Sequence, residues 1–490
     1  MSRSSRAWYP LLALLLGGNT ACRVGPDFVR PAPPPVSGYS DTTGSGMPGD
    51  PPPIPAVFGQ VIPSRWWQVF ESPALDSLVA QGIQENQTLA AAQASLAQAR
   101  ELLRQARGSE FPQVDASASA ARERLAAATT NASGSAANIY SVGTAASYPL
   151  DLFGGIRRKV EQAGALADNA RYEVGAAYVT LSGNVVTTAI TIASLRLQIL
   201  TVNDILADDQ RNLDLVQLKL AAGKAAPSDV LTAQSQLEAD RALAPPIRTQ
   251  LAQARHALAV LVGRFPAEWS APTFVLDSLR LPDSLPASLP SELVHRRPDI
   301  QAAQAELHAA SVAIGVAESQ LYPSITLSGS LSSESGALRG LLEGPSFAWN
   351  LVAGMIAPLF HGGALRAQKR AAVDAYESSL ALYRQTVMAA FQQVADVLFS
   401  LGADGQLVEA ERRALEVSQS AVELQRIAYG AGKSSLLQLI DAQRTNEQII
   451  LGYARARAQR FQDVAELFVA MGGGWSEATG PGSAEAGVPH

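Results

Sequence analysis

The sequence is poor in the side chains that most often carry chemistry in proteins. Its 490 residues include one cysteine, five histidines and five methionines, and these are too scattered to form a metal cluster. Neither a metal nor any other cofactor is therefore expected. The net charge is −6 and no sustained basic tract occurs, so nucleic acid is not an expected partner. Aromatic residues make up only 6%, which favours long helices packed through small side chains over several bulky cores.

Catalytic and nucleotide-binding motifs are also missing. The sequence has no Gly-x-Ser-x-Gly elbow, no paired histidines and no cysteine cluster, so an enzyme, such as an envelope hydrolase, is not expected. Gly432-Lys433-Ser434 looks like the end of a phosphate-binding loop. That loop needs a glycine five residues before Gly432, where Ile427 stands, and a strand leading into it. A long helix is expected there instead.

Residues 1–21 have the pattern of a secretory signal peptide. A positive start is followed by a short apolar run, Leu11 to Leu16, and by a small-residue cleavage point at Ala21-Cys22. The apolar run is too short to span a bilayer, which needs about 20 residues. Cys22 stands where a new N-terminus would be acylated, so it is the predicted lipid attachment site. The alternative is an ordinary signal that leaves Cys22 as a free thiol, and Asn19 is a departure from the usual lipoprotein signal.

The mature chain divides into a duplicated central part and two flanking segments. Residues 22–72 form a lipidated N-terminal segment that is rich in proline and expected to be extended. Residues 473–490 are rich in glycine, serine and glutamate and are expected to form a disordered tail. Between them lie two structural repeats, 73–263 and 290–472, which are joined by a linker, 264–289.

Motifs that recur in the same order identify the repeat. Phe111-Pro112 recurs as Tyr322-Pro323 at an offset of 211 residues. Ala222-Gly223-Lys224 recurs as Ala431-Gly432-Lys433 at an offset of 209. Because the offset is nearly constant, we interpret the chain as two copies of one unit.

Each repeat has a helical stretch, a β-hairpin and then a very long helix. The hairpins are predicted at about 113–148 and 324–358. The long helices are predicted at 156–221 and 364–430, and each would be about 100 Å long at about 1.5 Å per residue. A helix of this length needs a partner along it, which favours coiled packing.

The hairpins alternate in polarity. In 140–148 every second residue is apolar or threonine, with a tyrosine at each end, and 347–355 carries a similar apolar set. This pattern is typical of strands in a membrane barrel with aromatic girdles, and a soluble hairpin packed on helices is the alternative. Two hairpins supply only four strands, whereas known barrels need about eight. Several chains must therefore share one barrel, and strand counting does not choose between two and three.

Four groups of residues carry a resemblance to a known family. They are Cys22-Arg23-Val24-Gly25-Pro26-Asp27-Phe28, Asp151-Leu152-Phe153-Gly154, Arg297-Pro298-Asp299-Ile300, and Leu439-Ile440-Asp441-Ala442-Gln443-Arg444. The chain resembles the TolC-like outer-membrane factors, in the NodT-like lipoprotein branch that serves resistance-nodulation-division efflux systems. The resemblance implies a mainly α-helical fold with four membrane strands per chain. It further implies a homotrimer that completes a twelve-stranded β-barrel in outer-membrane lipid and a helical tunnel, the α-barrel, across the periplasm.

The resemblance also implies functional residues near the ends of the long helices. The two Ala-Gly-Lys sequences are expected to be hairpin turns that dock a periplasmic adaptor (membrane fusion) protein. The docking residues would be Gly223, Lys224, Gly432 and Lys433. The periplasmic gate residues would be Leu437, Asp441, Arg444, Tyr429 and Asp229. Simpler interpretations are that Asp229 lies in a first helical turn, where an acid is favourable, and that Asp441 and Arg444 form an i,i+3 surface pair.

The leading hypothesis is a passive export duct for small molecules. It would lie in the bacterial outer membrane, lipid-anchored and extending into the periplasm, and an inner-membrane resistance-nodulation-division pump would supply the energy. A type I secretion duct is an alternative of the same class. A soluble periplasmic coiled-coil adaptor or scaffold is an alternative of a different class, and it predicts that Trp349 is not exposed to lipid.

Overall fold

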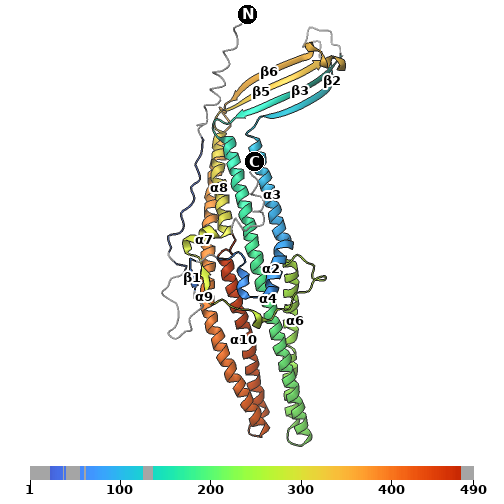
Figure 1. Ribbon diagram of the computed structural model, residues 1–490, viewed down its shortest axis with the longest axis vertical. Helices are drawn as coiled ribbons and strands as arrows, with labels where there is room; N and C mark the ends of the chain where they lie inside the picture. Colours follow the sequence, from blue (N-terminus) through green and yellow to red (C-terminus); the bar gives the residue numbers. More distant parts are fainter. Residues whose placement is uncertain (1–22, 37, 40–55, 60–61, 125–135, 476–490) are drawn as a thin grey trace. The chain divides into compact units, whose positions relative to one another are not determined.

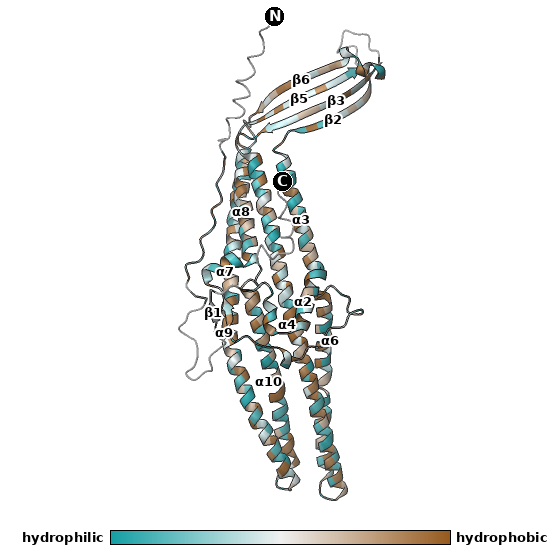
Figure 2. Cartoon of the chain, in the orientation of Figure 1, coloured by the Kyte–Doolittle hydropathy of each residue, from teal (hydrophilic) through white to brown (hydrophobic). Residues whose placement is uncertain are grey.

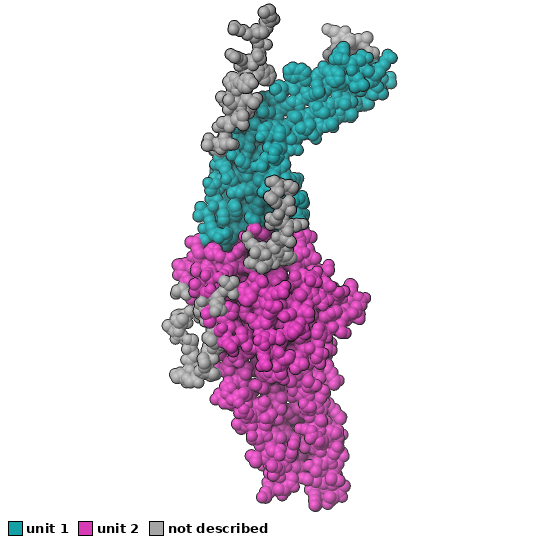
Figure 3. Space-filling view, in the orientation of Figure 1, with its two compact units in different colours: residues 1–31, 95–170, 302–384 teal, residues 32–94, 171–301, 385–490 magenta. Residues whose placement is uncertain are grey.

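The structure is a computed structural model that describes residues 23–36, 38–39, 56–59, 62–124 and 136–475. The predicted signal peptide, Cys22 and the chain after Trp475 lie outside the described residues. The chain forms two compact units, which Figure 3 colours separately. Unit 1 comprises Met1–Pro31, Ser95–Ala170 and Ala302–Arg384. Unit 2 comprises Ala32–Ala94, Arg171–Gln301 and Gln385–His490.

Unit 1 contains an antiparallel sheet of four strands (Figure 1). The strands are β2 (Gln113–Arg124), β3 (Ala136–Leu150), β5 (Ser324–Ser335) and β6 (Phe347–Ile356), and their order is β2-β3-β5-β6. The hairpin of the first repeat therefore pairs with that of the second through β3 and β5. The connection between β5 and β6 carries two short 3-10 helices, η4 (Leu338–Leu342) and η5 (Gly344–Ser346).

The register of this sheet gathers most of the large apolar residues of the strands on one face. Thr144 pairs with Leu331, which pairs with Trp349. The opposite face carries the polar residues, and there the hydroxyls of Ser119 and Ser141 lie 2.8 Å apart in a hydrogen bond. A slip of one residue would move every side chain to the other face, so this pattern fixes the register.

The two longest helices are α4 (Gly155–Ala221) and α9 (Ala364–Gly430), each of 67 residues. Both are continuous through their internal glycines. At Gly183 an added Cβ would lie 2.5 Å from the side chain of Val469, so this glycine permits close helix packing. Both helices contain a window that is long and apolar enough to cross a membrane by length and composition. Figure 2 shows apolar and polar residues interspersed along them.

The remaining helices complete the two repeats. The first repeat has α2 (Pro73–Glu85) and α3 (Gln87–Gly108) before its strands, and α5 (Pro227–Arg241) and α6 (Ala244–Leu261) after α4. The second has α7 (Pro290–Arg296), α8 (Pro298–Ser319) and α10 (Leu436–Ala470). The linker holds η3 (Leu276–Ser278) and β4 (Leu285–Ala287), which pairs in parallel with β1 (Ala56–Phe58). The prediction of a mainly helical chain with four strands is thus confirmed.

The core of unit 2 includes segments that the sequence placed outside the repeats. The 3-10 helix η2 (Trp66–Phe70) buries Trp66 completely, and its ring stacks on Phe468 with 5.3 Å between centroids. Near the end of the described chain, a Cβ on Gly474 would lie 2.0 Å from the carbonyl oxygen of Pro63. The chain is therefore packed as far as Trp475. Residues 473–475, the start of the expected tail at 473–490, are thus packed, because glycine allows the backbones to approach closely. Residues 476–490 lie outside the described residues.

Candidate functional site at the helical hairpin tips

The first helical hairpin of unit 2, formed by α4 and α5, turns at Gly223. This glycine has φ +69, the left-handed conformation that commonly ends a helix. The Lys224 N–H donates to the carbonyl of Lys219 at 2.8 Å, which closes the end of α4. Asp229 lies in the first turn of α5, and its carboxylate accepts a hydrogen bond from the Ala226 N–H at 2.9 Å. The first Ala-Gly-Lys sequence therefore lies in a hairpin turn, and Asp229 lies in a first helical turn, where it also caps the helix.

The second helical hairpin, formed by α9 and α10, turns in the same way at Gly432, which has φ +71. The Lys433 N–H donates to the carbonyl of Ala428 at 2.8 Å. Ser435 caps α10, since its hydroxyl accepts from the Gln438 N–H at 3.3 Å. The Gly-Lys-Ser sequence thus joins two helices. A phosphate-binding loop follows a strand, so this site is not one.

A small apolar cluster joins the two hairpins just behind the tips. Its buried members come from α4, α5 and α10, and Tyr429 of α9 packs against them. They are Leu213, Val216, Ala233, Leu237, Leu436 and Ile440. The cluster draws the first and second hairpins together at the level where the gate is predicted.

Tyr429 is also tied to the first hairpin by a positive charge. The Lys219 ammonium lies 3.6 Å from the centre of the Tyr429 ring and 3.3 Å from its carbonyl oxygen. Burial raises the pKa of the Tyr429 hydroxyl, and the negative charge of Asp229 raises it further. The structure therefore groups Tyr429 with Asp229, as the sequence prediction does, and adds Lys219, which that prediction missed.

Leu437, Asp441 and Arg444 lie on the exposed surface of α10, away from the contact that Tyr429 makes with the first helical hairpin. Their spacing places them on one face of α10, and all three are exposed, Leu437 by 69%. The opposite face of α10 is buried and contacts the first hairpin, where the Asn212 amide donates to Gln443 at 3.0 Å. No ion pair joins Asp441 to Arg444 among the described residues, so the simpler interpretation as a surface pair is not supported.

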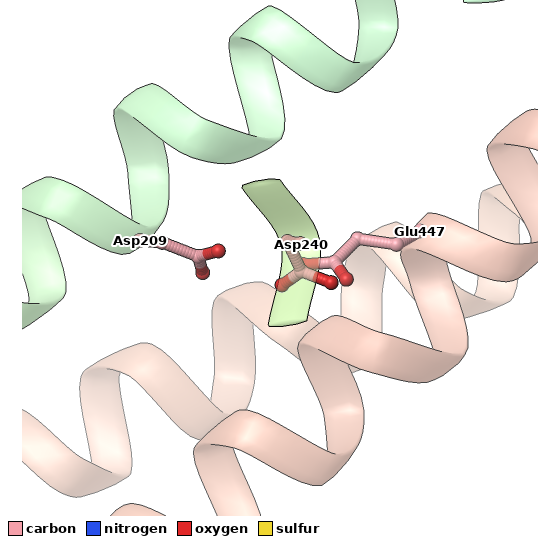
Figure 4. A group of neighbouring side chains, drawn as sticks. All are labelled: Asp209, Asp240 and Glu447. Carbon is pink, nitrogen blue, oxygen red and sulfur yellow. The ribbon is translucent and has the colours of Figure 1, made fainter. Parts of the chain in front are cut away.

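Two buried acidic groups were not found from the sequence. Asp209, Asp240 and Glu447 converge from α4, α5 and α10 (Figure 4). Asp404 of α9 lies beside Asp463 of α10, and both are buried. A signal for the first group existed: Asp209 continues the apolar period of Leu213 and Val216, and Asp240 that of Ala233 and Leu237. An acid on the buried face of a helix indicates a special environment.

The fold and this site together define a class of protein. Its sheet carries one apolar and one polar face, as the wall of a membrane barrel does, and helical hairpins make up its other unit. Residues 78–264 and 289–473 match the family model described as "Outer membrane efflux protein", and the chain belongs to this family.

Three individual proteins illustrate the relationship. The pyoverdine export outer membrane protein OpmQ of Pseudomonas aeruginosa is 32% identical over 418 residues, which cover 84% of this chain and 87% of OpmQ. The outer membrane protein OprJ of the same species is 30% identical, over 95% of each chain. Among solved structures, the outer-membrane channel OprN matches with a TM-score of 0.85 and 28% identity over 93% of this chain and 100% of OprN.

The chain is accordingly an outer-membrane efflux channel and not an enzyme. It is the outer-membrane component of an efflux system, so pump proteins are its partners. The alternative of a soluble adaptor is excluded, and the exposure of Trp349, at 79%, agrees with this.

Proposed function

We propose that three copies of the chain form one passive export duct, with a twelve-stranded barrel and a helical tunnel. The observation that carries this is the open sheet of unit 1, whose edge strands are β2 and β6. Open sheet edges do not occur in the hydrocarbon of a membrane, because their backbone groups would lack hydrogen-bond partners. Other copies must therefore pair with both edges, and four strands from each of three copies complete the barrel.

Helix α9 supports assembly as well. Its most apolar window is only 28% buried within one chain. Large side chains along it are exposed: Leu382, Met388, Phe399, Leu407, Val417, Leu424 and Ile427. Large apolar side chains that stay exposed at intervals along so much of a helix favour a contact with another protein surface. The mass of the detergent-extracted complex, measured by native mass spectrometry, tests the proposal. A trimer is expected, and a dimer or monomer would contradict it.

We also propose that the hairpin tips dock a periplasmic adaptor, through which an inner-membrane resistance-nodulation-division pump drives export of small molecules. The tips suit docking, since Gly223, Lys224, Gly432 and Lys433 are all exposed. Charge reversal of Lys224 and Lys433 to glutamate should reduce adaptor capture in pull-downs from the host. Reversal of Arg413, an exposed cation within α9, is the matched control. Equal capture by all the variants would contradict tip docking.

The proposed gate is the exposed face of α10, with Tyr429 and Asp229 holding the hairpins behind it. In a trimer, three copies of Asp441 would form a ring that attracts cations, with Leu437 as an apolar constriction and Arg444 beside them. Asp441→Ala should lower cation selectivity or raise conductance in single-channel recordings. Asp214→Ala removes a comparable exposed acid from α4 and should change neither quantity. If Asp441→Ala behaves like the control, Asp441 is not part of the gate.

Lipid anchoring at Cys22 is the last part of the proposal. The support comes from the residues that follow it, because Arg158, fully buried near the start of α4, holds them in place. Its guanidinium donates to the carbonyls of Val24 and Gly25, and to the Asp27 carboxylate at 2.9 Å.

The Val24 N–H also donates to the carbonyl of Phe153, between the end of β3 and the start of α4. The chain just after Cys22 is thus held where the barrel strand ends, within reach of lipid. Mass spectrometry of the mature N-terminus should find acyl chains on Cys22. An unmodified cysteine thiol there would contradict the anchor.

A further inference from the structure

Three acidic side chains meet between the two helical hairpins of unit 2. Asp209 extends from α4, Asp240 from the last turn of α5 and Glu447 from α10 (Figure 4). One oxygen of each lies within 4.8 Å of the others. The group therefore joins two helices of the first repeat to one helix of the second.

This acidic group is buried and short of hydrogen-bond donors. Asp209 is 3% exposed and Asp240 is 7% exposed. The Gln236 amide donates to Asp240 Oδ2 at 2.6 Å. Asp209 Oδ2 is shielded from water and accepts no hydrogen bond from an amide, hydroxyl or cationic group of the described residues. The hydrogen-bonding neighbour of the Asp209 carboxyl is the carboxyl of Asp240, a second acid. Burying carboxylate oxygens that only another acid faces is unfavourable, so a positive ligand at this point would stabilise the fold.

The surrounding charges do not neutralise the group. Arg444 on α10 is the cation that acts on Glu447, and Asp208 on α4 adds further negative charge. Asp208 itself lies beside Arg211 and is 3.7 Å from Arg426 of α9. Burial, together with the neighbouring acids, raises the pKa of Asp209 to about 8 and that of Glu447 to about 7. Ionised carboxylates are therefore costly here without a compensating cation.

We infer that Asp209, Asp240 and Glu447 bind one divalent cation of the calcium type. Calcium takes oxygen ligands at about 2.3–2.6 Å, so two ligands of one ion can be at most about 5 Å apart, as these are. Carboxylate ligands suit hard cations, whereas zinc and copper favour histidine and cysteine, which this group does not contain. Asp209 Oδ2, which accepts from no amide, hydroxyl or cationic group of the described chain, supplies a buried ligand atom that faces the other two acids.

The ion would act as a brace between the hairpins. It would hold α4 and α5 against α10, behind the face that carries Asp441, and would resist their separation. This consequence rests on the proposed gate, but the binding itself does not. Because the ligands must be ionised, binding of the cation should release protons and strengthen as the pH rises.

The test is calcium binding to the purified full chain in detergent, after removal of ions with EDTA. Equilibrium dialysis with radioactive calcium at pH 7.5 counts the bound ions. An Asp441→Asn background removes the exposed acid of the proposed gate from the count. One ion per chain is expected, and Asp240→Asn should weaken binding at least about tenfold. Asp214→Asn, the matched control, removes an exposed carboxylate of the same helix that is not among the three ligands, and it should leave binding unchanged.

Two results would overturn the inference. One is the absence of bound calcium at pH 7.5, which would mean that the group holds only protons. The other is unchanged binding in Asp240→Asn. Should that variant fail to fold, Glu447→Gln carries the same expectation. Since the ions are counted on purified protein, this outcome is independent of whether the channel is gated at its tips.

Discussion

The second hairpin contains a buried acid pair whose ionisation should set a pH limit on stability. Asp404 of α9 and Asp463 of α10 are 7% and 5% exposed. Burial raises the pKa of Asp404 to about 7, helped by its hydrogen bond to Asp463 and by the charge of that neighbour. The Gln459 amide donates to Asp463 at 2.7 Å, which favours a proton on Asp404. Asp404→Asn supplies a neutral donor of the same shape.

The size of the effect follows from the change in pKa on folding. In the unfolded chain the pKa of Asp404 is about 3.8, and in the folded chain it is about 7. The folded state therefore binds this proton more tightly, so the free energy of unfolding falls as the pH rises between these values. One pKa unit corresponds to about 1.4 kcal/mol, so the total loss is about 4 kcal/mol, of which about 2–3 kcal/mol falls between pH 5 and pH 8.

The assay is thermal unfolding of the detergent-solubilised protein, followed by circular dichroism at pH 5 and pH 8. Other buried acids act in the same direction, so the informative quantity is the difference between variant and wild type. Asp404→Asn should match the wild type near pH 5 and be more stable than it at pH 8. Asp396→Asn changes an exposed acid on the same helix and should follow the wild type. An equal fall in Tm for wild type and Asp404→Asn would refute the reasoning.

Three further predictions concern the turn, the contact between the hairpins and the barrel. Gly432→Ala should destabilise the chain by about 1–2 kcal/mol, measured by calorimetry, because its left-handed φ disfavours a side chain although no atom lies within 4 Å of the added Cβ. Lys219→Met should raise the open probability in single-channel recordings by removing the cation over the Tyr429 ring, and an unchanged value would count against that contact as a latch. Trp349→Arg should be unfavourable by about 2–4 kcal/mol at the lipid face and reduce the amount of folded barrel in outer-membrane fractions. Asn350→Arg, on the polar face, should not, and equal loss in both would contradict the assigned faces.

Much of the fold could be predicted from the sequence because the elements are long and strongly patterned. The predicted helices at 156–221 and 364–430 agree with α4 and α9 to within one residue. Their internal glycines do not break these helices, and at Gly183 the missing side chain leaves room for Val469. The strands were recognisable since their alternation persists through the sheet.

The contacts between distant parts of the chain could not be predicted. Trp66 follows a proline-rich stretch, and only the fold reveals that it fills the space beside Phe468. The contact of Lys219 could not be predicted because its partner, Tyr429, lies 210 residues away in the chain. The acidic group of Asp209 and its neighbours shows the same difficulty: each acid alone is an ordinary helical residue, and their approach depends on how three helices pack.

The two helical hairpins differ at equivalent positions near their tips, and this difference indicates which of them moves. Leu437, Asp441 and Arg444 on α10 correspond, at the repeat offset of 209, to Ser228, Thr232 and Ser235 on α5. Both sets are exposed in the single chain, so the same helix face is exposed in both repeats. Only in the second repeat does this face carry bulky and charged side chains. The second helical hairpin could also move more simply as one body, because α10 runs unbroken for 35 residues. In the first helical hairpin, a break after Arg241 divides the returning helix into α5 and α6. A constriction carried by a continuous helix can be withdrawn by tilting that helix as a whole. This asymmetry supports assigning the gate to α9 and α10 and the fixed wall to α4 and α5.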